Sequence, residues 1–340
     1  MYTIIDYLKF YSDASLNEVK WNNIDNLMAA IIVYLPIPSF KDNKSLKELC
    51  DYTTKNETDI RGFTATKAVE ILNIIKNSKK YKNITIYNFI NVKNEDSQFG
   101  ARIIKTDKEK IISFKGTDRS LIGWLENFRL MYEYPTYTQN LAIKYLNDNI
   151  NFIDKDIYVV GHSKGGNLAM ASTMELSDSK FNKIKEVCNF DGPGFKKQEY
   201  ESKKFKRLKS KLINVTPTRS VIGTILYNDN YKVVSSNEYA FDEHYPTSWK
   251  LFGQYFVEGK LSTISKQFHK NTSDGLETLD KEKLKKTIET SFKSFEKEYS
   301  SDFTSISFND IKNFYTNMKN VDPEIRDYLT VLMEELIKYS

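Results

Sequence analysis

Residues 161–165 of this 340-residue chain, Gly-His-Ser-Lys-Gly, have the types and spacing best suited to chemistry. They follow an apolar β-type run, Ile157 to Val160, and precede a helix-forming segment, Asn167 to Leu176. A strand, a sharp turn and a helix are the context in which G-x-S-x-G forms a nucleophile elbow. The glycines relieve crowding in such a turn, and the helix N-terminus favours developing negative charge. Ser163 is therefore predicted to be a nucleophile; the alternative is a tight turn whose serine has no chemical role.

A serine hydroxyl is a weak nucleophile at neutral pH and needs a base within hydrogen-bonding distance. The chain has three histidines. His162 adjoins the serine, so its ring is expected to point elsewhere and to support the turn. His269 lies in a charged stretch and is expected on the surface. His244 follows the last expected strand, in the chain order serine, acid, histidine, and is the predicted base; the alternative is a loop histidine without a role.

The third member of such a site is a carboxylate that orients the imidazole and stabilises its charged form. The turn after the strand expected at 211–215 contains no carboxylate. Asp191 ends the preceding strand, and the Gly-Pro-Gly of residues 192–194 turns the chain away after it. Asp191 is the predicted acid, with Asp229 and Asp242 as alternatives. The other interpretation of Asp191 is an Asx turn that caps its strand.

Two backbone N–H groups must face the oxyanion that forms when the serine attacks. One is expected from Lys164, the residue after the nucleophile, and the other from Thr117, where Gly116 lets the backbone approach closely. The alternative for the second is an ordinary strand-ending turn that caps the next helix. An apolar loop and two tryptophans are candidates for lining an acyl pocket, and plain core positions are the alternative for them: Trp124, Val221, Ile222, Leu226 and Trp249.

The elements that must position these residues follow from the hydrophobic pattern. Residues 1–80 are predicted to be helical, because apolar residues recur there at helical spacing. Three strands with antiparallel pairing follow, at 84–92, 101–104 and 110–114. Helices and strands then alternate, which predicts an α/β fold with a mostly parallel sheet, helices on both faces and a site at the carboxyl ends of the strands. The expected helices lie near 120–133, 136–149, 166–177 and 196–210, and the expected strands at 156–160, 186–190, 211–215 and 231–235.

The pattern divides the chain into three segments. A helical segment, 1–80, is expected to pack on an α/β core at 81–260, and a second helical segment, 261–340, follows. In the last segment Asp322-Pro323 is typical of a helix start and predicts a helix over 324–338. The same segment carries one apolar stripe on a helix rich in Lys and Glu: Leu284, Ile288, Phe292, Phe295 and Tyr299.

Composition excludes several classes of protein. The net charge of +5, from 50 Lys and Arg against 45 Asp and Glu, does not by itself indicate a nucleic-acid partner. Cys50 and Cys188 lack metal-like spacing and suit buried positions in a reducing compartment. Residues 1–6 lack the start of a signal peptide, and no apolar run of about 18 residues is present to span a membrane. The expectation is a cytoplasmic protein with a small ester or lipid substrate and, at most, peripheral contact with a membrane.

Four segments together resemble the bacterial DUF2974 (Mbeg1-like) family of α/β-hydrolases, which is related to class 3 lipases. They are F-K-G-T-D at 114–118, G-H-S-K-G-G-N-L-A at 161–169, N-F-D-G-P-G-F at 189–195 and Y-K-V-V at 231–234. The resemblance extends over most of the chain. It implies an α/β-hydrolase fold, a triad of Ser163, Asp191 and His244, and esterase or lipase-like activity. It does not supply a substrate.

These expectations combine into a serine carboxylic-ester hydrolase that works through an acyl-enzyme and needs neither a metal nor an organic cofactor. Two alternatives stay open. The mild positive charge and the apolar loop allow a lipase or phospholipase that acts at a membrane. The second alternative is a non-catalytic α/β-hydrolase scaffold that binds a ligand or a protein partner. The presence of all three triad residue types argues against this alternative.

Overall fold

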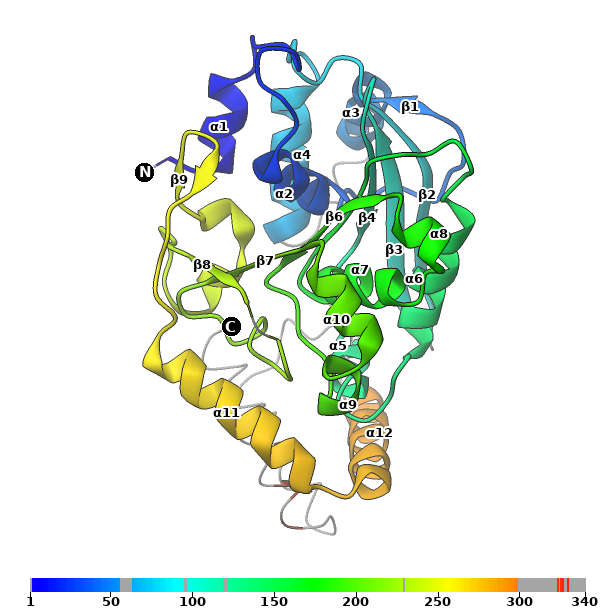
Figure 1. The fold of residues 1–340 in the computed structure, drawn as a ribbon, viewed down its shortest axis with the longest axis vertical. Helices are drawn as coiled ribbons and strands as arrows, with labels where there is room; N and C mark the ends of the chain where they lie inside the picture. Colours follow the sequence, from blue (N-terminus) through cyan, green and yellow to red (C-terminus); the bar gives the residue numbers. More distant parts are fainter. Residues whose placement is uncertain are drawn as a thin grey trace.

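The computed structural model describes residues 2–55, 63–94, 97–118, 121–228 and 230–298, together with Pro323, Ile325, Arg326 and Leu329. An eight-stranded sheet in the order β1 to β8 forms the centre of this described part (Figure 1). Its strands are β1 (Lys44–Ser45), β2 (Thr85–Lys93), β3 (Gln98–Lys105), β4 (Lys110–Phe114), β5 (Ile157–His162), β6 (Ile184–Phe190), β7 (Leu212–Pro217) and β8 (Lys232–Val234).

The type of pairing between neighbouring strands changes once across the sheet, at β4. Strands β1 to β4 pair antiparallel, and β4 to β8 pair parallel. The predicted antiparallel entry and the predicted α/β class with a mostly parallel sheet are both confirmed. Strand β1 lies in a segment that was expected to be helical, where it pairs with Thr85 and Ile86 at the edge of β2. A two-residue strand is too short to show a period in the sequence.

Four helices from the N-terminal segment cover one face of the sheet: α1 (Ile4–Phe10), α2 (Asn23–Ile32), α3 (Leu46–Lys55) and α4 (Phe63–Ile75). Helix α2 begins with a capping box, in which the Asn22 side chain accepts from the Ile24 N–H at 2.9 Å. The Asp25 side chain accepts in return from the Asn22 N–H at 2.9 Å. This start fixes α2, whose carboxyl end reaches the site described below.

Helices α6 (Tyr137–Asp148), α7 (Lys164–Met174) and α10 (Lys203–Lys209) cover the other face. Along β5, Ile157 and Val159 pack on this side, while Tyr158 and Val160 pack under the N-terminal helices. Burial on both faces explains the unbroken apolar run of this strand. The helix expected at 196–210 is instead two short helices, α9 (Lys197–Tyr200) and α10, because the Ser202 side chain caps a new start by accepting from the Phe205 N–H at 3.1 Å.

A third apolar cluster lies at the carboxyl edge of the sheet and joins side chains of α5 (Leu121–Arg129), α11 (Thr263–Thr278) and α12 (Lys281–Glu298); α12 packs directly against α5. Figure 1 shows α11 and α12 at the end of the molecule opposite α1 to α4. The predicted stripe is confirmed for Leu284, Ile288 and Phe292, which are buried in this cluster. The side chain of Phe295, all of Tyr299 and the predicted helix start at Asp322 lie outside the described residues.

The remaining regular elements follow β8 or lie at the surface: α8 (Asp178–Phe181), the 3-10 helices η2 (Ala240–His244) and η3 (Pro246–Ser248), and the hairpin of β9 (Leu251–Phe252) and β10 (Tyr255–Phe256). Among the described residues, no helix combines the length and apolar character needed to cross a membrane.

Candidate active site

Ser163 lies in the predicted sharp turn between β5 and α7. Its φ of 58° and ψ of −136° are strained for a residue with a side chain. The flanking glycines are required sterically. A β-carbon on Gly161 would lie 2.1 Å from the Gly165 carbonyl oxygen, and one on Gly165 would lie 2.2 Å from the Phe114 carbonyl oxygen. The segment therefore forms the strand, elbow and helix that hold a serine hydroxyl at the end of a sheet.

Asp191 and His244, 53 residues apart, form a direct ion-pair contact at this edge. Oδ2 of Asp191 lies 2.6 Å from Nδ1 of His244. Because a carboxylate accepts, Nδ1 carries a proton and donates it. The Asp191 side chain is fully buried, and 11 % of the His244 side chain is exposed. The pair has the arrangement of an oriented base whose second nitrogen can take a proton.

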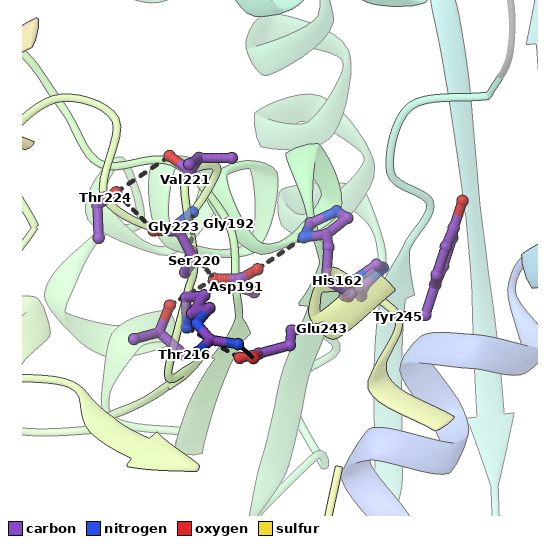
Figure 2. A network of polar contacts seen from close by, with 12 residues as sticks. His162, Asp191, Gly192, Thr216, Ser220, Val221, Gly223, Thr224, Glu243 and Tyr245 are labelled. Carbon is purple, nitrogen blue, oxygen red and sulfur yellow. Dashed lines mark hydrogen bonds and ion pairs between the residues drawn. The ribbon is translucent and has the colours of Figure 1, made fainter. Parts of the chain in front are cut away.

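The other oxygen of Asp191 is held by two hydroxyl groups. Thr216 Oγ1 and Ser220 Oγ both donate to Oδ1, the latter at 2.5 Å (Figure 2). The Asp191 N–H donates to the Val215 carbonyl at 2.8 Å, so the β7 end fixes the backbone as well. These bonds leave the carboxylate little freedom to rotate away from His244.

Glu243 is a second buried carboxylate next to this pair, and the pattern analysis did not single it out. Its Oε2 accepts from the Arg219 N–H at 2.9 Å, and the Arg219 guanidinium lies 3.7 Å from Oε1. Burial raises the pKa of Glu243, and the negative charge of Asp191 adds to the effect. Of the two alternative acids, Asp242 is exposed, and Asp229 lies outside the described residues.

His162 packs against His244 as well as supporting the turn. Its Nε2 lies 2.8 Å from the His244 carbonyl oxygen, so Nε2 donates, and the two ring centroids are 4.5 Å apart. Nδ1 then accepts from the Tyr34 hydroxyl, at 3.4 Å. Burial, and next the charge of His244, hold the pKa of His162 well below its usual value. A neutral ring is therefore maintained beside the expected base.

Tyr34, just beyond the end of α2, joins three segments of the site. A β-carbon on Gly116 would lie 2.1 Å from the Tyr34 hydroxyl oxygen, 2.5 Å from the His162 carbonyl oxygen and 3.0 Å from the Ser163 β-carbon. The hydroxyl also lies 3.4 Å from the His162 carbonyl. Only glycine fits where these groups converge. The pattern analysis missed Tyr34, because no local signal connects residues 128 positions apart.

The expected oxyanion segment, 116–118, passes beside the elbow. Gly116 lies next to Ser163, because a β-carbon on Gly116 would be 3.0 Å from the Ser163 β-carbon. The Thr117 hydroxyl accepts from Asn127 Nδ2 at 2.8 Å. The Asp118 N–H donates to Gln98 Oε1 at 3.3 Å. Helix α5 and the start of β3 thus hold the segment close to the serine.

The candidate pocket residues fall into two groups. Val221, Ile222 and Leu226 are buried together with apolar residues of α5, α11 and α12. Trp249 is not part of this group; it packs in the core under the N-terminal helices, and its Nε1 donates to the Glu243 carbonyl at 2.7 Å. It supports the His244 segment instead of the loop. The side chain of Trp124, on α5, lies outside the described part of the structure.

His269, expected on the surface, is partly exposed and also contacts the loop before β8. Its ring is half-buried, and Nδ1 lies 2.9 Å from the Thr224 carbonyl oxygen, to which it donates. Because the apolar side of α11 packs against residues 221–226, this histidine on the same helix is brought against the loop. The charged neighbours of His269 gave no sign of that packing.

The sheet, the strained serine between β5 and α7, and the Asp–His pair at the ends of later elements define an α/β-hydrolase type of fold. The chain belongs to the Mbeg1-like family, whose sequence model matches residues 75–293. The predicted family is thus confirmed. None of the curated proteins compared with the chain matches it. Among solved structures, that of M37 lipase is similar with a TM-score of 0.39 and 13% sequence identity, over 73% of this chain and 79% of the lipase chain.

Proposed function

We propose that the protein is a serine carboxylic-ester hydrolase with Ser163 as nucleophile, His244 as base and Asp191 as the acid that orients it. The observation that carries the proposal is the 2.6 Å contact between Asp191 and His244 at the sheet edge where Ser163 occupies a strained elbow. Strain at one residue and a buried carboxylate–imidazole pair are both costly, and they are typical of sites that perform chemistry.

In the proposed reaction His244 Nε2 takes the Ser163 proton while Oγ bonds to the ester carbonyl carbon. The tetrahedral intermediate collapses, the bond to the alkoxy group breaks, and His244 returns its proton to the leaving alcohol. Water then attacks the acyl-enzyme with His244 again as base, and Ser163 is released with the free acid. Asp191 keeps the proton on Nδ1 and stabilises the imidazolium. The Thr117 and Lys164 N–H groups face the oxyanion.

The test is hydrolysis of p-nitrophenyl butyrate together with labelling by a fluorophosphonate probe. We expect Ser163→Ala to lose both, and Ser179→Ala, at an exposed serine on α8, to keep both. A wild-type rate no higher than that of Ser163→Ala, with no labelling, would refute the proposal. That result would favour the alternative of a scaffold that binds a ligand or partner without catalysis.

A lipase acting on long acyl chains is the second candidate. Its support is the third apolar cluster, in which Val221, Ile222 and Leu226 meet side chains of α11 and α12 beside the site. A series of p-nitrophenyl esters from acetate to palmitate, with and without liposomes, separates the candidates. A rate that rises with chain length and with liposomes supports the lipase, and a maximum at short chains supports a soluble esterase.

A further inference from the structure

The side chain of Lys164 forms a buried ion pair directly behind the nucleophile. Its ammonium lies 2.5 Å from Glu126 Oε2, 2.8 Å from the Gln98 carbonyl oxygen and 2.9 Å from Gln98 Oε1. Both side chains of the ion pair are 2 % exposed. An oxyanion donor at this position needs only its backbone N–H, so the hydroxyl chemistry of Ser163 does not by itself require a charged side chain here.

The partners of Lys164 are the same groups that hold the segment 116–118. Gln98 Oε1 accepts from both the Lys164 ammonium and the Asp118 N–H. Glu126 neighbours Asn127 on α5, and Asn127 donates to the Thr117 hydroxyl. A β-carbon on Gly123 would lie 3.0 Å from Thr117 Cγ2, so α5 passes very close to this segment. One lysine thus connects the elbow to the segment expected to supply the second oxyanion donor.

The hydrogen bonds of this network are not all satisfied within the described part of the structure. Glu126 Oε1 and Gln98 Nε2 are buried and have no hydrogen-bond partner among the described residues. Burial raises the pKa of Glu126 despite the adjacent ammonium. A well-packed apolar pair in place of a buried ion pair is often as stable or more stable. Buried polar groups left unsatisfied in this way call for a functional explanation.

We propose that Lys164 is a positioning residue whose buried ammonium, through Gln98 and Glu126, fixes the segment 116–118 relative to the elbow so that the Thr117 and Lys164 N–H groups converge on one oxyanion. The inference rests on the proposed function, since an oxyanion forms only if Ser163 attacks a carbonyl. Lys164 acts twice in this arrangement: its backbone binds the oxyanion, and its side chain places the other donor.

The test compares Lys164→Met with the double variant Lys164→Met, Glu126→Met. Methionine is unbranched like lysine and one heavy atom shorter; it keeps the backbone N–H and removes the charge. We expect kcat per active site, titrated with the fluorophosphonate, to fall about 10- to 100-fold in both, with little change in KM, because the donors shift by a fraction of an ångström. The double variant should recover thermal stability, because no unpaired charge stays buried, yet it should not recover kcat.

A second readout addresses the oxyanion directly. Thionoesters place sulfur where the oxyanion forms, and sulfur fits a preorganised pair of N–H donors poorly. The ratio of ester to thionoester turnover should therefore fall in both Lys164 variants. The matched control is Lys80→Met, which breaks a buried lysine–carboxylate pair under the N-terminal helices. It should lose stability but keep the wild-type ratio and kcat per site.

The outcomes separate the two proposals. If the wild-type protein neither turns over esters nor reacts with the probe, the proposed hydrolase function and this inference both fall. If the wild type is active and the Lys164 variants keep its kcat per site and its ratio, only the positioning role is refuted. Recovery of kcat in the double variant would likewise show that the pair acts only through stability.

Discussion

Two buried lysine–carboxylate pairs, one under the N-terminal helices and one behind Ser163, differ in how completely their hydrogen bonds are satisfied. Under the N-terminal helices, Lys80 Nζ lies 2.9 Å from each carboxylate oxygen of Asp25 and 2.8 Å from the Tyr7 hydroxyl. Asp25 also accepts from the Tyr81 hydroxyl at 2.5 Å and from the Asn22 N–H. Every polar atom of this pair is used. Behind Ser163, Lys164 is also buried, but Glu126 keeps one oxygen without a partner among the described residues.

The difference indicates different roles. A fully satisfied buried network gives one rigid arrangement, and the Lys80 network joins α1, α2 and the residues before β2 in this way. The Lys164 network contacts the segment 116–118 through Gln98, but it leaves Glu126 Oε1 and Gln98 Nε2 without a partner among the described residues. We therefore expect substitutions in the Lys80 network to lower the stability of the protein. Substitutions around Ser163 and Lys164 are expected to lower turnover while the protein stays folded.

Replacing one buried carboxylate in each region gives the largest contrast. Asp191→Asn should lower kcat about 10⁴-fold, because the amide favours the wrong tautomer of His244. Asp25→Asn should lower the free energy of unfolding by about 3–5 kcal/mol, because it leaves the Lys80 ammonium buried without its counter-charge. Turnover per titrated site and urea unfolding of the two variants check both expectations. An Asp191→Asn enzyme with near wild-type kcat would move the acid elsewhere, and Asp229→Asn would then be tested.

The stability of the region around Ser163 should depend on pH through His162. The pKa of His162 is well below its unfolded value of 6.5, so protonation favours the unfolded chain. The stability from this residue is present above pH 6.5 and is lost as pH falls below it, by up to about 1.4 kcal/mol per pH unit.

Urea unfolding of wild type and His162→Gln at pH 7.5, 6.5 and 5.5 measures this contribution. Glutamine does not titrate, and its amide is able to donate to the His244 carbonyl, so the variant should lose less stability on acidification. Equal slopes for the two proteins would show that His162 is not the acid-sensitive group.

Removing one tyrosine hydroxyl from each of the two regions is expected to have the smallest effect. Tyr34→Phe takes away the group that contacts His162 beside Gly116, so kcat should fall a few-fold, with a loss of about 1 kcal/mol in stability. Tyr7→Phe should cost about 1–3 kcal/mol, because the Lys80 and Asn22 donors lose an acceptor, and it should leave kcat per site unchanged. A Tyr34→Phe enzyme with unaltered kcat would confine Tyr34 to a structural role.

Local pattern was enough to predict much of the site. The elbow, the position of Asp191 at a strand end and the position of His244 after the last strand follow from residue types next to strands and turns, and the structure brings Asp191 and His244 together. The same reasoning made Trp249 a candidate for the acyl pocket, with a core position as the alternative, and the structure packs it in the core against Phe190 and Phe256. An apolar residue has the same pattern in either place, so only packing distinguishes them.

The chain by itself determined its family, the positions of most strands along the sequence and the residue types of the candidate site, because these depend on neighbours within a few positions. The tertiary structure alone decided which distant groups surround that site. Tyr34 reaches His162, Glu243 reaches Arg219, His269 reaches Thr224, and Lys164 reaches Gln98 and Glu126. These contacts join residues from 24 to 128 positions apart. A buried polar group without a hydrogen bond is costly, so each of these groups bonds to the partner that the fold places beside it.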